Sequence, residues 1–270
     1  MIGLRLLHAC AAVCLGAAAC SSPSEIPGDD ANTGQTTGSA RQTEDVSGRV
    51  TVLAASSLTD VFTELAEGFR ADHPGTDVVL SFAGSSTLAS QVRQGAPADV
   101  LATASSATMR QVTEEGLASS QPEPLAGNVL EVVVPAGNPG GVEDIGDLAD
   151  PDLSVALCAA QVPCGAAAQR VLENAGVEVS PATLESDVRA VLTKVSLGEA
   201  DAGLVYATDV RAGGDQVTGI PITGAEQATT EYQVAVLEEA PNPVAARAFV
   251  AHVLSQEGRA ALDEAGFLPP

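Results

Sequence analysis

Serine hydroxyls occur at two points where an apolar, strand-like run passes into a helical pattern. One is Ser57 in VLAASSLTDVFTELAEGF, residues 52–69, and the other is Ser85 in VVLSFAGSSTLASQV, residues 78–92. The first turn of a helix carries backbone N–H groups without intrahelical partners and a partial positive charge. Hydroxyl donors beside such a turn add to its attraction for negative charge, so both junctions favour the binding of an anion.

Helix capping is the simpler explanation for one such serine, because Ser is a common N-cap residue. Here, however, two serines follow runs that are expected to be parallel strands. Ligands of open α/β sheets bind outside the carboxyl ends of the strands. The repetition therefore favours a ligand site made of neutral donors.

Alternating strand-like and helical patterns extend from residue 49 to the end of the chain and predict an α/β fold with mostly parallel sheets. The length favours two such units, with the residues after 238 forming helices that pack back on the first. The apolar runs expected as strands are 50–56, 77–83, 98–104, 129–135, 153–159, 202–208 and 232–238. Clear helical stripes are formed by Leu58, Val61, Phe62, Leu65 and Phe69, and by Val188, Val191, Leu192 and Val195.

The composition argues against a nucleic-acid-binding protein. The 270 residues include 12 Lys and Arg against 35 Asp and Glu, for a net charge of −23. Proteins that neutralise phosphates need clustered basic residues. An anion site remains compatible with this charge, because local dipoles act at contact distance while the global field is screened within about 8 Å.

The N-terminal segment MIGLRLLHACAAVCLGAAAC has one charge, Arg5, followed by a short apolar run and small residues. This pattern predicts a signal peptide over residues 1–19. The small residues before Cys20 favour a lipoprotein in which Cys20 is lipidated, and the alternative is an ordinary secretory signal cut near Ala19. Residues 20–48 are rich in Ser, Thr, Gly, Pro and acidic residues, which predicts a disordered tether to an exported body.

Two cysteines, Cys158 and Cys164, remain after the signal cysteines and Cys20 are assigned. Outside the cytoplasm, two remaining thiols this close in sequence favour a disulfide. A metal site is disfavoured because no second pair or nearby His supplies further ligands. An enzyme is also disfavoured, since a serine nucleophile needs a base and the exported body has only His73 and His252, both in surface or packing contexts.

Five sequence blocks together resemble the periplasmic molybdate-binding proteins of ABC transporters, in the family's order and at compatible spacings. The resemblance extends from about Val50 to Phe267. The blocks are VLAASSLTD, SFAGSSTLASQVRQGAPADV, VPCG, SDVRAVLTKV and AGLVYATDV. The resemblance implies the two-lobed periplasmic-binding-protein fold of type II. Lobe 1 would be formed by residues 49–130 plus 233–270 and lobe 2 by residues 131–232, with a hinge between them.

The resemblance also implies a ligand set. The matching positions are two serine donors, two backbone donors and a tyrosine: Ser57, Ser85, Cys164, Val188 and Tyr206. Cys164 departs from the family's V-P-A-G turn, but a backbone donor leaves its side chain free to bond to Cys158. These contacts would hold molybdate or tungstate as an oxyanion, with no cofactor and no direct protein ligand to molybdenum.

The expected protein is a monomer that closes its lobes on the anion and delivers it to a membrane permease and its ATPase. It is expected to be exported and held at the outer face of the cell membrane by lipid on Cys20, or to be periplasmic. Alternatives are a binding protein for sulfate, phosphate or an organic acid, and, less favoured, a secreted hydrolase. An organic carboxylate usually requires an Arg clamp. Arg93 and Arg189 lie in helices next to the site loops and keep that alternative open.

Overall fold

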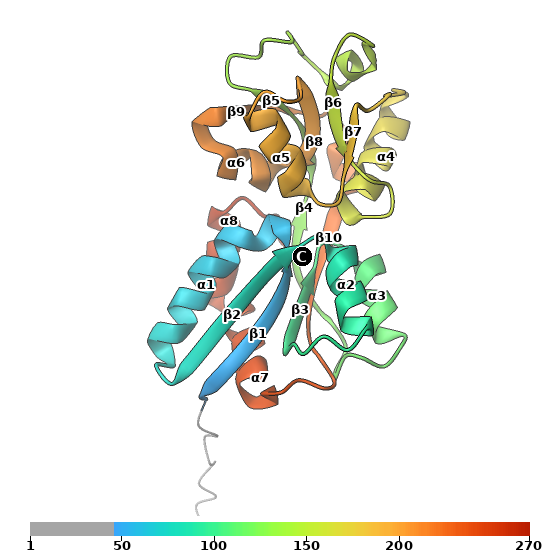
Figure 1. Ribbon diagram of the computed structural model, residues 1–270. Helices are drawn as coiled ribbons and strands as arrows, with labels where there is room; N and C mark the ends of the chain where they lie inside the picture. The colour runs from blue at the N-terminus through green and yellow to red at the C-terminus, as the bar shows by residue number, and fades with distance from the viewer. Residues whose placement is uncertain (1–45) are drawn as a thin grey trace, which may run out of the picture. The chain divides into compact units, whose positions relative to one another are not determined.

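The computed structural model describes residues 46–270, which form one compact unit (Figure 1). The expected signal peptide, Cys20 and the tether up to residue 45 lie outside the described residues. Within 46–270, no helix combines the length and the apolar character needed to cross a membrane.

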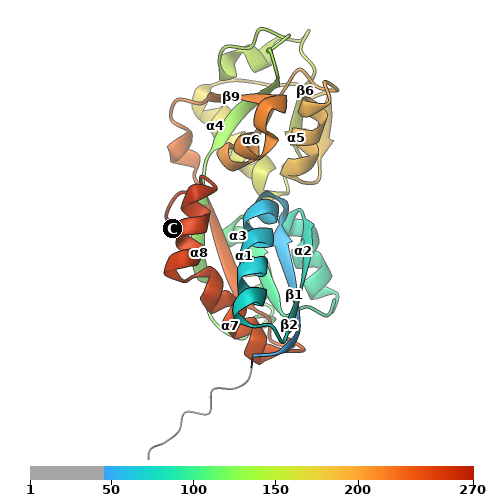
Figure 2. The same cartoon turned by 90° about the vertical axis from the view of Figure 1, so that its left-hand side faces the viewer.

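Lobe 1 is built on a five-stranded sheet with helices on both faces (Figures 1 and 2). Its strand order is β2 (Thr76–Ala83), β1 (Gly48–Ala55), β3 (Val100–Thr103), β10 (Thr230–Val236) and β4 (Glu123–Asn128). Its helices are η1 (Ser56–Leu58), which leads directly into α1 (Thr59–Asp72), then α2 (Ser85–Arg93), α3 (Ser106–Thr113), α7 (Pro243–Val253) and α8 (Gln256–Glu264).

Lobe 2 repeats this plan with a second five-stranded sheet. Its strand order is β7 (Thr183–Glu185), β6 (Val155–Cys158), β8 (Ala202–Tyr206), β5 (Leu130–Pro135) and β9 (Val217–Pro221). Its helices are α4 (Pro163–Ala175), α5 (Val188–Ser196) and α6 (Ala207–Gly213), with short turns η2 (Ile145–Ala149), η3 (Gly214–Gln216) and η4 (Ala225–Ala228).

The expected α/β fold in two lobes is confirmed, and both sheets are mixed. In lobe 1, β1 pairs in parallel with β2 and β3, whereas β10 runs antiparallel to β3 and β4. In lobe 2, β6 pairs in parallel with β7 and β8, whereas β5 runs antiparallel to β8 and β9. The strands β4, β5 and β10, which take part in antiparallel pairs, carry the chain between the lobes (Figure 1). The sequence did not predict these pairs, because an apolar run does not show whether a strand runs parallel or antiparallel to its neighbour.

The core of lobe 1 lies on both faces of its sheet. On one face, α1, α7 and α8 pack together (Figure 2), and Phe69 and Phe249 meet edge to face with ring centroids 5.3 Å apart. On the other face, Leu88 of α2 and Met109 of α3 pack against Leu101 of β3. The C-terminal helices thus pack on lobe 1, as the sequence predicts.

A buried carboxylate, Asp99, fixes the start of α7 to the sheet. It accepts hydrogen bonds from the backbone N–H of Thr51 on β1 at 2.7 Å and of Asn242 at 2.6 Å. Asn242 in turn caps α7 through the N–H of Ala245. A buried carboxylate is costly unless it is hydrogen-bonded, so we assign Asp99 a structural role.

Candidate functional site

One cleft between the lobes is lined by all five residues that the sequence singled out. Ser57 and Ser85 come from lobe 1, and Cys164, Val188 and Tyr206 come from lobe 2. The other lining residues are Ala55, Ser56, Gly84, Ala104, Val162, Pro163, Ser186 and Asp187. The space between these residues measures about 220 Å³, open solvent included. The cleft therefore suits a small solute.

Four helix starts reach this cleft, two from each lobe: η1 with α1, α2, α4 and α5. The first residues of η1, α2 and α4 have no side-chain cap, which leaves their first N–H groups available to a ligand. Pro163 at the start of α4 has no N–H, so Cys164 supplies the first donor of that helix. The aligned N-termini make the cleft locally attractive to an anion despite the acidic surface.

The hydroxyl of Ser85 is oriented by the backbone of the neighbouring strand end. Its buried Oγ accepts a hydrogen bond from the N–H of Ala104 at 2.9 Å. With that lone pair occupied by a donor, the Ser85 proton is free to be donated into the cleft. The side chain thus contributes one hydrogen-bond donor and no charge.

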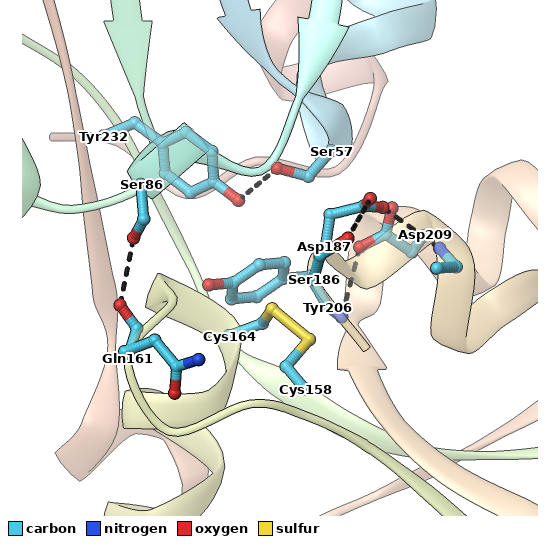
Figure 3. The surroundings of a disulfide bond; sticks show 11 residues. Ser57, Ser86, Cys158, Gln161, Cys164, Ser186, Asp187, Tyr206, Asp209 and Tyr232 are labelled. Atoms are coloured by element: carbon cyan, nitrogen blue, oxygen red, sulfur yellow. Dashed lines mark hydrogen bonds between the residues drawn. A yellow bond between two sulfur atoms is a disulfide. The ribbon is translucent and has the colours of Figure 1, made fainter. Parts of the chain in front are cut away.

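Tyr206 ends β8, and its ring lies between the disulfide and Ser57 (Figure 3). Its side chain is 1% exposed, and its hydroxyl has no hydrogen-bond partner among the described atoms. Burial raises the pKa of Tyr206 above its ordinary value, so the hydroxyl stays protonated. Buried hydroxyls are almost always hydrogen-bonded, so a hydroxyl at the edge of this cleft is available as a donor to a ligand.

The disulfide between Cys158 and Cys164 ties the end of β6 to the first turn of α4 (Figure 3). The loop it closes is tight, because a side chain at Gly165 would overlap the carbonyl oxygen of Ala159. The disulfide uses only the Cys164 side chain, so the backbone N–H of this residue, which lines the cleft in the first turn of α4, stays available. The covalent link thereby holds one of the donors in place.

Alkylation of the unreduced exported chain is expected to leave Cys158 and Cys164 unlabelled. Reduction should lower the free energy of unfolding by about 2 kcal/mol, the loop-closure value for a loop this short. Intact mass with and without reductant tests the first point, and thermal unfolding of Cys158→Ser tests the second. A labelled Cys158 in the unreduced protein would remove the disulfide from this account.

Charged side chains play little direct part in the cleft. Among its lining residues there is no Lys or Arg, and the one acid is Asp187. The Asp187 carboxylate caps α5 by accepting from the N–H of Ala190 at 3.1 Å, as its position in the sequence indicates. Because Asp187 borders the cleft, a ligand that carries no proton is expected to lie against the donors rather than beside its carboxylate.

The two arginines that could have formed a carboxylate clamp are both paired elsewhere. Arg93 binds Glu115 at 2.6 Å on the surface of lobe 1. Arg189 lies 2.9 Å from the buried Asp209 of α6 and also pairs with Asp60 of α1, so it joins the lobes. Burial raises the pKa of Asp209 to about 7, although the Arg189 guanidinium opposes this shift.

The lobes also touch beside the cleft. Ser86 of α2 donates to the carbonyl of Gln161 at 2.9 Å (Figure 3), and Arg211 of α6 donates to the carbonyl of Glu264 at 2.7 Å. Gly84 is packed against Ser186 of the other lobe. This arrangement is the closed one, with donors from both lobes directed at one space.

Sequence reasoning missed two residues beneath the cleft, Tyr232 of β10 and Asn128 of β4. Tyr232 was included in an apolar run, although its hydroxyl is hydrogen-bonded to Ser57 at 2.8 Å (Figure 3). The chain has only two tyrosines, and a polar atom within a buried strand needs a partner. The need of a buried tyrosine hydroxyl for a hydrogen-bond partner was the sequence signal that could have identified Tyr232.

Comparison with known proteins gives the family. The sequence model of the protein family described as "bacterial extracellular solute-binding protein" matches residues 50–268 of this chain. The chain belongs to this family. This solute-binding protein is therefore an exported binding protein rather than an enzyme, as the sequence predicts.

Similar proteins include molybdate-binding proteins. The chain is 42% identical over 221 residues to the molybdate-binding protein ModA of Mycobacterium tuberculosis, covering 82% of this chain and 85% of the relative. The substrate-binding domain of a putative molybdenum ABC transporter from Clostridium difficile has a TM-score of 0.63 and 26% identity, covering 83% of this chain and all of that one. The periplasmic molybdate-binding protein of Azotobacter vinelandii shares the fold, with a TM-score of 0.70, 21% identity, and coverage of 82% and 99%.

Proposed function

We propose that this solute-binding protein captures molybdate, and tungstate as its chemical analogue, for an ABC importer. The observation that carries the proposal is the set of neutral donors from two lobes around one small cleft, including the unpartnered Tyr206 hydroxyl. The 42% identity to a molybdate-binding protein supports the same ligand. No cofactor is needed, because the oxyanion is the transported cargo.

The chemistry of the donor set distinguishes ligand classes. Molybdate at neutral pH accepts hydrogen bonds and has no proton to donate, so a site made of donors satisfies it. Hydrogen phosphate also has to donate a proton, and Asp187, which already caps α5, is the one acid bordering the cleft. Sulfate also carries no proton, so it remains the alternative ligand. The site would have to distinguish it from molybdate by the size of the anion.

Ligand contacts are assigned to the same five positions in this proposal. The side-chain hydroxyls of Ser57, Ser85 and Tyr206 and the backbone N–H groups of Cys164 and Val188 bind the oxyanion. Binding draws together lobe 1 (49–130 plus 233–270) and lobe 2 (131–232) by a hinge motion.

Partners and location follow from the same role. A membrane permease and its ATPase would receive the closed monomer. Lipid on Cys20 would keep the protein at the outer face of the cell membrane, although a single anchor of modest length is weak. Intact mass of protein extracted from membranes tests the anchor, and a mass matching an unmodified chain cut near Ala19 would disprove it.

Thermal unfolding in the presence of four anions tests the ligand. A ligand at 100 times its Kd stabilises the folded state by about 2.7 kcal/mol, which is about 5–10 °C for a chain of this size. We expect this shift with micromolar molybdate or tungstate, and little with sulfate or phosphate at the same concentration. Equal shifts with all four anions would contradict the assignment.

A further inference from the structure

Ser57 differs from Ser85 in what orients its hydroxyl. Ser85 accepts from a backbone N–H, which can act only as a donor. Ser57 instead meets the hydroxyl of Tyr232 at 2.8 Å, and both side chains are buried. Either hydroxyl could donate in such a pair, so the direction depends on the other neighbours of Tyr232.

Asn128 settles this direction. Its Oδ1 accepts from the backbone N–H of Val129 at 3.0 Å, which places its amide nitrogen on the other side. That nitrogen donates to Thr208 Oγ1 at 2.8 Å and, in a longer contact, reaches the Tyr232 hydroxyl at 3.5 Å. An amide nitrogen cannot accept, so Tyr232 receives from Asn128.

Of the two side chains hydrogen-bonded to Tyr232 within lobe 1, Ser57 and Asn128, only Ser57 can accept its proton. Tyr232 then donates its hydrogen bond to the Ser57 oxygen, and the Ser57 proton is left to point into the cleft. Burial raises the pKa of Tyr232 well above its ordinary value, so the phenol keeps the proton that this arrangement needs.

We propose that Tyr232 is a positioning residue that fixes Ser57 as a hydrogen-bond donor, and so adapts the site to oxyanions that carry no proton. The inference rests on the proposed function and extends it from the ligand contacts to the residue behind one of them. A ligand that had to donate to Ser57 would meet a proton there instead of a free lone pair.

Tyr232→Phe removes only the hydroxyl and keeps the ring that packs 5.3 Å from Phe267 and 6.0 Å from Tyr206, measured between centroids. We expect the molybdate Kd, measured by titration calorimetry, to rise about 10-fold. The apo melting temperature of each variant checks that it is folded. A merely structural role would weaken all anions alike, so a second readout is needed.

A double-mutant cycle supplies that readout. If Tyr232 acts through Ser57, the Ser57→Ala/Tyr232→Phe protein should bind molybdate as weakly as Ser57→Ala alone. The matched control is Ser57→Ala/Tyr206→Phe, which removes two separate ligand contacts and should bind more weakly than either single variant. Additive losses for Ser57 and Tyr232, or wild-type affinity in Tyr232→Phe, would overturn the proposal.

Selectivity gives an independent check with sulfate and hydrogen phosphate. In Tyr232→Phe, sulfate affinity should fall by the same factor as molybdate affinity, whereas phosphate affinity should hold or rise. Equal losses for all three anions would overturn the selectivity claim. If the wild-type protein binds sulfate but not molybdate, the proposed ligand is wrong, and the cycle run with sulfate still decides the role of Tyr232.

Discussion

Gly84→Ala is expected to raise the molybdate Kd about 100-fold, because the added methyl group opposes contact between the lobes. Gly84 lies before α2 with φ −58° and ψ 134°, a conformation that alanine adopts readily. In the closed arrangement, however, the new Cβ would overlap the carbonyl oxygen of Ser186 in the other lobe. The methyl group therefore opposes closure without straining lobe 1.

Calorimetric titration measures the affinity of Gly84→Ala, and small-angle scattering with and without molybdate reports closure. The matched control is Gly68→Ala in α1, where a Cβ would meet the His252 ring at an ordinary 3.5 Å and affinity should be unchanged. The apo melting temperature of Gly84→Ala should stay near the wild-type value. Unchanged affinity in this variant would mean that the lobes do not close around the ligand as described.

Ser85→Ala is expected to raise the molybdate Kd about 10- to 100-fold, because a hydrogen bond to a charged group contributes about 1.5–3 kcal/mol. The substitution removes the donor directed at the anion. It also leaves the N–H of Ala104 without its partner at the same buried position. Tungstate affinity should fall by a similar factor, since both oxyanions present the same acceptors.

Ser86→Ala is the matched control for this prediction, because Ser86 is the next residue of α2 and does not line the cleft. It loses a hydrogen bond to the Gln161 carbonyl, so its effect should stay within a few-fold. Titration of both variants under the same conditions makes the comparison. Equal effects at the two serines would indicate a general disturbance of α2 rather than a lost ligand contact.

The fold was predictable where the patterns are long. The apolar runs around β1, β2, β5, β8 and β10 and the stripes of α1 and α5 appear close to their expected positions. Three strands were missed: β4 reads EPLAGN, β7 has three residues, and β9 reads VTGIP. Short edge strands with Pro or Gly carry little periodicity, and their pairing depends on neighbours far along the chain.

Ser57 and Ser85 were accessible from sequence because they lie at strand-to-helix junctions, whereas Cys164, Val188 and Tyr206 were indicated only by the family resemblance. Residues that support the donors from behind were not accessible. Tyr232 approaches Ser57 across 175 positions of sequence, and Asp209 meets Arg189 only through the packing of α5 and α6. Such contacts depend on tertiary structure, which a single sequence pattern does not specify.

The net negative charge of the protein does not prevent anion binding in the cleft. A net charge of −23 opposes an anion at long range, but salt screens that field within about 8 Å. Helix starts and hydroxyls act at contact distance and are not screened inside a closed cleft. Local geometry rather than net charge therefore determines which solute is held.

A crystal structure of the protein grown with molybdate would show the ligand contacts themselves, because the anomalous signal locates the metal. We expect the metal in the cleft between the lobes, with its oxygens hydrogen-bonded to the hydroxyls of Ser57, Ser85 and Tyr206 and to the backbone N–H groups of Cys164 and Val188. Molybdenum at another place, or oxygens bound by Lys or Arg side chains, would contradict this expectation.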